Sequence, residues 1–248
     1  MDKSINKYIS ETGFCSRREA DKYIEQGRVT INDNIASKGN RVEDGDVVEV
    51  DGEPLKKKKA TVLIALNKPK GITCTTDLKD KTNIIDYVNF SSRIFPIGRL
   101  DKLSEGLIFL TNDGDIVNKI LRAGNQHEKE YYVVVDKPIN LEFIKAMRNG
   151  VRIMGTTTQK CFVHQEGSDR FRIILTQGLN RQIRRMCEAL GYNVRSLKRI
   201  RIMNMTLKDL APGKWRYFTK EETTTINEMV ATSSKTAKGN NDNDGMDE

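Results

Sequence analysis

The sequence predicts an α+β fold: a small N-terminal α/β domain, then a larger domain with a mixed, largely antiparallel sheet and packed helices. The chain has 248 residues, 37% hydrophobic and 31% charged, which is enough for one large domain or two modest ones with real cores. After residue 61, apolar runs typical of strands alternate irregularly with amphipathic helical stretches. This order disfavours a doubly wound parallel sheet, because that fold needs a regular strand and helix repeat.

Residues 1–52 have the pattern of the small α/β domain. Apolar residues of a first helix share one face, and Ser16 and Glu19 have the spacing of a capping box that starts a second helix. Short strands are expected at residues 29–31 and 47–50, separated by turns rich in Asn, Asp and Gly. We therefore expect a helical first half and a stranded second half.

Residues 62–228 are expected to form the larger domain. The lysine-rich segment 53–61 before it is predicted to be a solvated linker, and residues 229–248, with almost no apolar content, a disordered tail. Strands are expected at residues 62–66, 107–110, 131–135, 161–164, 171–175 and 201–207. Helices are expected at residues 115–122, 141–148, 181–190 and 220–228.

The composition argues against several classes of protein. No uncharged apolar run is long enough to cross a bilayer and the N-terminus lacks the apolar core of a signal peptide, so a cytoplasmic protein is expected. Four widely spaced cysteines and two histidines disfavour a disulfide scaffold, a zinc site and Ser-His-Asp catalysis. Any chemistry is expected to depend on carboxylate, Tyr, Lys or Arg side chains.

The positive charge is concentrated in the larger domain. The formal net charge is +8, and residues 61–230 contain 28 Lys and Arg against 18 Asp and Glu. Residues 1–60 are balanced, with 12 of each sign. A localised basic surface is most often explained by a polyanionic partner, with nucleic acid first among them, although some proteins are mildly basic without such a partner.

One candidate site is the segment 95–114, in which Asp101 lies between Arg99 and Lys102 just before an apolar strand. Nearby cations favour the ionised carboxylate and can also hold a phosphodiester close to it. Such a carboxylate could act as a nucleophile or a base. Taken alone, the pattern is better explained by a surface salt bridge with little effect, because neighbouring Asp and Arg residues are common.

A second candidate is the segment 177–186, where Gly178 precedes a predicted helix. Its first turn carries Arg181, Arg184 and Arg185 at helical spacing, which predicts one basic face opposite an apolar one. Arginine suits phosphate and carboxylate recognition because its planar guanidinium can donate two parallel hydrogen bonds. We therefore expect this helix to dock by its apolar side and present its arginines.

A third candidate is the strand that begins with Tyr131 and Tyr132. Successive strand residues face opposite sides of a sheet, so the two rings are expected on different faces. An aromatic ring at the edge of a basic cleft can stack on an extruded base. Packing in the core is at least as good an interpretation for Tyr132, and a weaker one for Tyr131.

Taken together, these motifs resemble the three active-site motifs of the RsuA-type ribosomal pseudouridine synthases. The matching segments, in the same order and spacing, are Gly98–Asp101 with Ser104–Leu107, Lys129–Tyr131 and Gly178–Met186. The segment 5–21 is similar to the S4 RNA-binding domain that is attached to these enzymes. The resemblance covers residues 3–228 and therefore implies an S4-type domain followed by a pseudouridine synthase domain.

The resemblance also assigns expected roles. It implies that Asp101 is the catalytic aspartate, Tyr131 the tyrosine that stacks on the base, and Arg184 the arginine paired with the aspartate. Expected RNA-binding residues are Arg99, Leu100, Lys102, Arg181, Gln182, Ile183 and Arg185 in the larger domain and Arg17 and Arg18 in the S4-type domain. In that domain we expect Lys3, Lys7, Arg17, Arg18, Lys22 and Arg28 to form a basic helical face.

The implied reaction converts uridine to pseudouridine without a cofactor or a metal. The implied partner is 23S ribosomal RNA, some members of the family also modify a tRNA anticodon stem-loop, and a monomer is expected. Asp101 could attack the sugar or the base, or remove a ribose proton. Two other interpretations are considered. A non-catalytic RNA-binding protein is disfavoured because a carboxylate in its basic surface would weaken phosphate binding. A hydrolase that uses Asp101 with Glu105 is disfavoured because the sequence has no metal cluster and no clear second acid.

Overall fold

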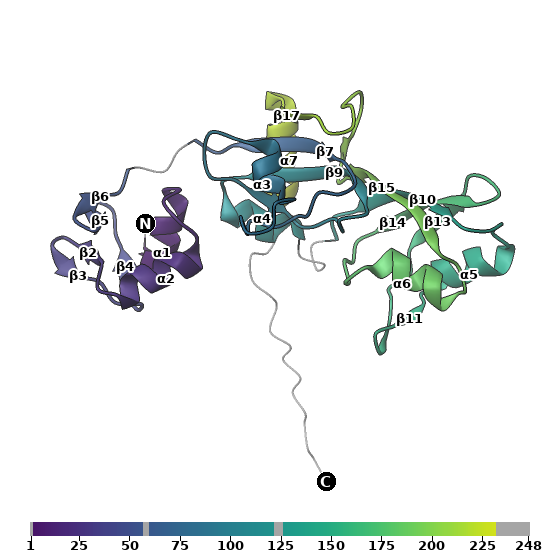
Figure 1. Cartoon of the computed structure of the whole chain (residues 1–248), viewed down its shortest axis with the longest axis horizontal. Coiled ribbons are helices and arrows are strands. Elements are labelled where there is room, and N and C mark those ends of the chain that lie inside the picture. Colours follow the sequence, from purple (N-terminus) through teal and green to yellow (C-terminus); the bar gives the residue numbers. More distant parts are fainter. Residues whose placement is uncertain (1, 57–59, 122–125, 232–248) are drawn as a thin grey trace, which may run out of the picture.

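The computed structural model describes residues 2–56, 60–121 and 126–231, and its N-terminal domain lies at one end of an elongated molecule (Figure 1). Two helices, α1 (Ile5–Glu11) and α2 (Arg17–Glu25), pack on short strands. These strands are β1 (Lys3–Ser4), β2 (Val29–Ile31), β3 (Asn34–Ile35), β4 (Arg41–Val42), β5 (Val48–Val50) and β6 (Glu53–Pro54). They form one sheet of order β3-β2-β5-β6 and a separate pair, β1 with β4.

The predicted capping box of the N-terminal domain is confirmed. The Ser16 hydroxyl accepts a hydrogen bond from the Glu19 amide at 3.2 Å, and the Glu19 carboxylate accepts one from the Ser16 amide at 2.8 Å. These bonds satisfy amides that a helix start leaves free. Ile5 and Ile9 of α1 and Ile24 of α2 are buried together, so the apolar faces of both helices make the core of this domain.

In the described part of the larger domain, nine strands form one sheet. The sheet runs β13-β14-β10-β15-β9-β7-β17, with β16 paired to β15 and β8 to β9. Every pairing is antiparallel except that of β15 with β9. The strands are β7 (Leu63–Lys68), β8 (Phe95–Ile97), β9 (Glu105–Thr111), β10 (Lys129–Val135), β13 (Phe162–Gln165), β14 (Arg170–Leu175), β15 (Val194–Ile202), β16 (Met205–Thr206) and β17 (Trp215–Tyr217). The predicted mixed, largely antiparallel sheet is confirmed.

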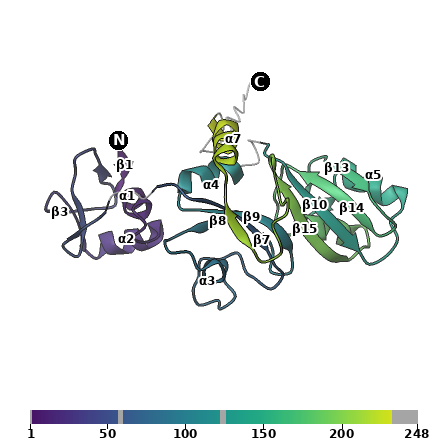
Figure 2. The ribbon, with the colours of Figure 1, turned by 90° about the horizontal axis from the view of Figure 1, so that it is seen from above.

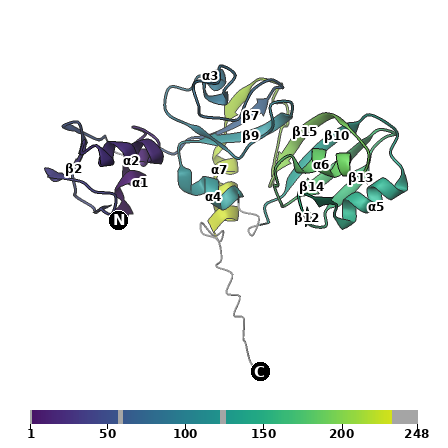
Figure 3. The ribbon, with the colours of Figure 1, turned by 60° about the horizontal axis from the view of Figure 1, so that its bottom comes forward.

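Helices cover both halves of this sheet. Figures 2 and 3 show α4 (Gly114–Leu121) and α7 (Lys220–Ala231) on one side of β7 and β9 and α3 (Ile84–Val88) on the other. The other half, β10, β13 and β14, packs on α5 (Leu141–Asn149) and α6 (Gln182–Ala189), near the small hairpin of β11 (Arg152–Ile153) and β12 (Thr156–Thr157). No helix within the described ranges is long and apolar enough to span a bilayer.

Some elements differ from the sequence-based prediction. The strand expected at residues 201–207 is the end of a longer strand, β15, followed by a turn at Met203, whose φ is +52°, and by β16. Helix α3 and strands β8 and β17 were not expected from the sequence, and each is at most five residues long. Helix α7 continues to Ala231, past residue 228. Residues 57–59 of the expected linker and 232–248 of the expected tail lie outside the described residues.

Candidate active site

The connection between β8 and β9 positions Asp101. Its backbone is tied at several points: the Ser104 amide donates to the Asp101 carbonyl at 2.9 Å, and the Gly71 amide donates to the Lys102 carbonyl at 2.8 Å. Leu100, which is buried, anchors the loop from below in the core formed with β7 and α3. The Asp101 side chain remains 32% exposed, so a fixed loop presents a carboxylate that a ligand can reach.

Two arginines of the third motif face this carboxylate. The Arg184 Nε lies 3.7 Å and the Arg181 Nη1 3.8 Å from the Asp101 Oδ2. Both distances are too long for hydrogen bonds and short enough for strong attraction between charges. The two guanidiniums therefore stabilise negative charge on Asp101 and leave its oxygens free to accept or attack.

Arg184 is held more rigidly than Arg181. Its guanidinium donates to the Val194 carbonyl at 3.3 Å and to the Ser104 hydroxyl at 3.2 Å, and it is 8% exposed. Burial lowers the pKa of Arg184, with Asp101 acting in the opposite direction. Arginine stays charged despite such a shift because its ordinary pKa is above 12, so Asp101 has a permanent cationic neighbour.

The predicted basic face of α6 is wrong for Arg184, which is buried and does not lie beside Arg185 on a displayed surface. Arg181 precedes the helix in a left-handed conformation, with φ of +51° and no side-chain cap. Arg185 is half-buried and donates to the backbone and side-chain oxygens of Asn180. The three arginines thus have separate environments, since Arg184 is buried, Arg185 is half-buried and Arg181 is exposed.

Tyr131 lies on β10 where the two halves of the sheet meet. Its ring packs against the core of the β10 half and also against the core beneath α3. Arg199, its register partner on β15, has its guanidinium carbon 6.0 Å from the ring centroid. The ring is therefore supported from behind and only partly buried, as a stacking surface requires.

These groups share one cleft of about 900 Å³. Of the predicted site residues, those that line it are Arg99, Leu100, Asp101, Lys102, Tyr131 and Arg181. Gln182 and Ile183 are 5% and 4% exposed; Gln182 accepts a hydrogen bond from the Leu179 amide at 3.0 Å, and Ile183 belongs to the core under β10. Both side chains are therefore buried where they fix the loop before α6, they are not among the residues that line the cleft, and their contact with RNA stays a prediction.

Lys129 and Arg199 also line the cleft and are absent from the predicted site. The strand period carries a signal for Lys129: it precedes Tyr131 by two positions and so shares its face of the strand. Arg199 could not be identified in this way, because a run of cations hides the alternation of β15. Glu105, the second acid of the hydrolase interpretation, is not among the residues that line the cleft.

The S4-type domain displays part of its expected basic face. Arg17 and Arg18, at the start of α2, are exposed. Lys3 pairs with Glu11, Arg28 pairs with Asp51, and Lys7 pairs with Asp115 of the larger domain at 2.9 Å. Half of the six expected cations are therefore engaged in ion pairs, which narrows the free basic surface to the α2 side.

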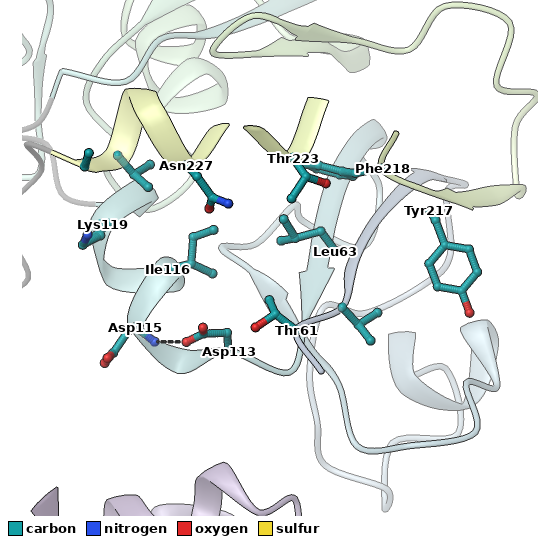
Figure 4. Close-up of a pocket in the computed structure, with 13 residues that line it drawn as sticks. Thr61, Leu63, Asp113, Asp115, Ile116, Lys119, Tyr217, Phe218, Thr223 and Asn227 are labelled. Carbon is teal, nitrogen blue, oxygen red and sulfur yellow. Dashed lines mark hydrogen bonds between the residues drawn. The ribbon is translucent and has the colours of Figure 1, made fainter. Parts of the chain in front are cut away.

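A different pocket, of about 730 Å³, lies between the start of β7, α4 and α7 (Figure 4). Its floor includes Leu63, Ile116 and Phe218, and at its rim the Asp115 amide donates to the Asp113 carboxylate at 2.9 Å. None of the predicted site residues lines it. The cleft that contains Asp101 is therefore the candidate active site.

Comparisons with known proteins identify the family of both domains. The family model for RNA pseudouridylate synthase matches residues 62–189 and that for the S4 domain matches residues 4–48. A pseudouridylate synthase crystal structure superposes with a TM-score of 0.66 at 26% identity, covering 92% of this chain and 99% of that one. Ribosomal large subunit pseudouridine synthase B of Bacillus subtilis (strain 168) is 32% identical, covering 88% of this chain and 93% of its own length.

Similarity is higher to the RluF member. The segments 121–125, 128–131 and 178–182 already resemble RluF in sequence, although residues 122–125 lie outside the described structure. Dual-specificity RNA pseudouridine synthase RluF of Escherichia coli (strain K12) is 58% identical over 236 residues, and the match covers 94% of this chain and 81% of that protein. The chain belongs to the RNA pseudouridylate synthase family, as an RsuA-type member with an N-terminal S4 domain.

Proposed function

We propose that this protein converts specific uridines of 23S ribosomal RNA to pseudouridine, with Asp101 as its catalytic residue and a tRNA anticodon stem-loop as a second substrate. The observation that carries the proposal is the placement of one accessible carboxylate 3.7 Å from a buried arginine, in a cleft that a tyrosine also lines. The second substrate is inferred from the dual specificity in the name of the relative that is 58% identical over 236 residues.

The reaction uses the carboxylate in its ionised form. Asp101 either attacks the nucleotide or removes a ribose proton, and both routes need a negative oxygen that no hydrogen bond occupies. The spacing of Arg184 and Arg181 meets that need, because they stabilise the charge at 3.7 and 3.8 Å without hydrogen bonding to the oxygen. The bond between uracil N1 and ribose C1′ then breaks, the base turns within the site, C5 bonds to C1′ and loses its proton, and N1 gains one.

The cleft has the size and charge to take a uridine out of a helix. Besides Asp101, the charged side chains that line it are cations, namely Arg99, Lys102, Lys129, Arg181 and Arg199. The exposed cations Arg99, Lys102 and Arg181 hold the flanking phosphates, and the Tyr131 ring covers one face of the extruded base. A single carboxylate among five cations is unfavourable for a simple phosphate-binding surface unless that carboxylate has a chemical role.

The decisive experiment maps pseudouridine in ribosomal RNA fragments by chemical modification and reverse-transcription stops. Wild-type protein should give stops at defined uridines, and Asp101→Asn should give none while its melting temperature stays within about 2 °C of wild type. Asp209→Asn, an exposed carboxylate outside the cleft, should retain activity. Equal product from Asp101→Asn and wild type would remove Asp101 from its role, and an absence of stops with wild type would refute the activity.

The S4-type domain is proposed to select the RNA. Removing Arg17 and Arg18 together should weaken binding of the large RNA and flatten the dependence of log Kd on log salt concentration by about 1 for each phosphate that is no longer neutralised. The rate of the bound complex should not change, because both side chains belong to α2, whereas the residues that line the cleft belong to the larger domain. An unchanged salt slope would show that this surface does not contact RNA.

The two proposed substrates are tested in separate experiments. Ribosomal RNA fragments and an unmodified tRNA anticodon stem-loop are each incubated with the protein, and product is quantified at each uridine. Product in both supports dual specificity. Product in ribosomal RNA alone would limit the proposal to the first substrate.

A further inference from the structure

The cleft face of the β10 and β15 pair contains two buried cations without a carboxylate partner. Lys129 is 8% and Arg199 3% exposed, and within residues 2–56, 60–121 and 126–231 neither forms an ion pair. Lys129 Nζ donates to the His127 carbonyl at 3.1 Å, and Arg199 Nε to the Leu107 carbonyl at 2.7 Å. The Arg199 Nη2 is buried without a hydrogen-bond partner in the described part of the chain.

The opposite face of the same two strands is built differently. There Arg201 donates to Glu130 at 2.6 Å and to Glu128 at 2.9 Å, and Arg172 of β14 also contacts Glu130. Buried charges in proteins are normally paired in this way, because an unpaired charge costs several kcal/mol of desolvation. The contrast between the faces therefore indicates that the two cations on the cleft side are kept for a ligand.

Register places these cations beside the reacting base. Arg199 lies directly opposite Tyr131, and Lys129 is two positions before Tyr131, so the three side chains are on one face of the sheet. All three line the cleft that contains Asp101. A uracil that stacks on Tyr131 would thus turn its edge toward a positively charged floor.

The chemistry of the reaction supplies a negative charge at that position. When the bond between N1 and C1′ breaks, its electron pair stays on the uracil and the charge spreads from N1 to O2 and O4. C5 then forms the new bond to C1′ with a ring electron pair, C5 loses its proton, and N1 gains one. Donors that meet the oxygens while they are negative accelerate such a step, as in an oxyanion hole.

We propose that Lys129 and Arg199 form an anion site that stabilises a carbonyl oxygen of the uracil as the base leaves its ribose. In this site Lys129 is a catalytic residue that contacts the oxygen. Arg199 is a positioning residue that supports the Tyr131 ring and adds positive charge behind it. The inference rests on the proposed function, since it concerns the same cleft and the same reaction.

The test measures the single-turnover rate of pseudouridine formation with saturating enzyme, together with the Kd for the RNA. Removing one donor from an oxyanion-type site typically costs about 10²- to 10³-fold in rate, so Lys129→Gln should lose that much while its Kd stays within threefold. Lys198→Gln is the matched control, since register places it opposite Tyr132; its rate should stay within threefold. A Lys129→Gln protein that reacts at the wild-type rate would overturn the proposal.

A second arm uses the unaltered protein, in case the variants do not fold. The target uridine is replaced by 2-thiouridine or 4-thiouridine, because sulfur accepts hydrogen bonds poorly. One of these substitutions should slow wild type at least tenfold, and where Lys129→Gln folds, the same substitution should slow that variant at least tenfold less than it slows wild type. If neither changes the wild-type rate, the anion site is refuted, whereas failure of wild type on normal RNA would refute the proposed function instead.

The pH profile separates this role from a structural one. Burial and, after it, the charge of Arg199 lower the pKa of Lys129 to about 8. Because the protonated amine is the active form, the rate should be full below this pKa and fall as pH rises through it, and Arg199→Lys should leave that limb near pH 8. The other ionisable groups that face Lys129 or share its cleft are His127, Cys74, Arg99, Asp101, Lys102, Tyr131 and Arg181. An alkaline limb that persists unchanged in a folded Lys129→Gln protein would refute the assignment.

Discussion

Replacing Gly106 by alanine should damage the junction on which the cleft is built. Gly106 belongs to β9 and has φ of +107°, a conformation that L side chains rarely adopt. A Cβ atom at this position would lie 2.2 Å from the carbonyl oxygen and 2.7 Å from the amide nitrogen of Arg199. Both atoms are backbone, so the clash cannot be relieved by a rotamer change and the two strands must separate.

The expected loss in unfolding free energy follows from these two effects, the strained backbone and the separation of the strands. A non-glycine residue in such a conformation costs about 1–3 kcal/mol. Separation of the strands disturbs the parallel pairing of β15 with β9, which consists of two register pairs, Lys198 with Glu105 and Arg199 with Gly106. If each of the two register pairs loses one hydrogen bond at about 1 kcal/mol, the unfolding free energy of Gly106→Ala should fall by about 3–5 kcal/mol in total. This is a large part of the stability of a typical domain.

The assay is thermal and urea unfolding of the full chain. At about 2–4 °C per kcal/mol for a protein of this size, Gly106→Ala should melt at least about 6 °C below wild type. Gly114→Ala is the matched control, because a Cβ there meets nothing within 4 Å and its φ is ordinary; it should melt within about 2 °C of wild type. Equal melting of Gly106→Ala and wild type would show that the junction is not held as described.

Two further predictions concern titratable groups. Hydrogen bonds from Arg216 lower the pKa of Glu222 from 4.5 to about 2, so the ionised carboxylate adds about 3 kcal/mol to the free energy of unfolding; this contribution is full above pH 4.5 and is lost as pH falls toward 2. The difference in unfolding free energy between wild type and Glu222→Gln should therefore close over that pH range. A difference that persists at pH 2 would contradict this linkage. Burial raises the pKa of Cys187 to about 12, so iodoacetamide at pH 8 should label this thiol only after the protein unfolds. Peptide mass spectrometry would measure the labelling, and rapid labelling of the native protein would disprove the burial of Cys187.

The sequence predicts the regular elements well where one physical signal dominates. The Ser16 capping box and the apolar run of β7 are local patterns, and both elements appear within two residues of the expected positions. Strand β15 is different, because it carries four cations among nine residues and such a run is usually a solvated surface. Its polarity is explained by tertiary contacts, Arg201 with two glutamates and Arg199 in the cleft, which a local pattern does not reveal.

The sequence predicts only part of the candidate site, because several of its residues are defined by tertiary contacts and not by a local pattern. Asp101 stood out only in combination with the other two motifs, since a carboxylate between cations is by itself typical of an exposed ion pair. Gln182 and Ile183 belong to a motif that shapes the loop before α6, and motif membership does not distinguish a residue that touches a ligand from one that supports the loop. That distinction depends on how exposed each side chain is: Gln182 is 5% exposed, whereas the Asp101 side chain is 32% exposed.

The position of the cleft follows from the single parallel pairing within the described sheet. Antiparallel neighbours can be joined by short turns, whereas β9 and β15 are far apart in sequence and meet side by side only because Gly106 lets their backbones approach. This contact brings Tyr131 and Arg199, from one half of the sheet, against the loop that carries Asp101 in the other half. Neither half contains all the groups that the reaction needs, so stability of the junction and catalysis should decline together when it is disturbed.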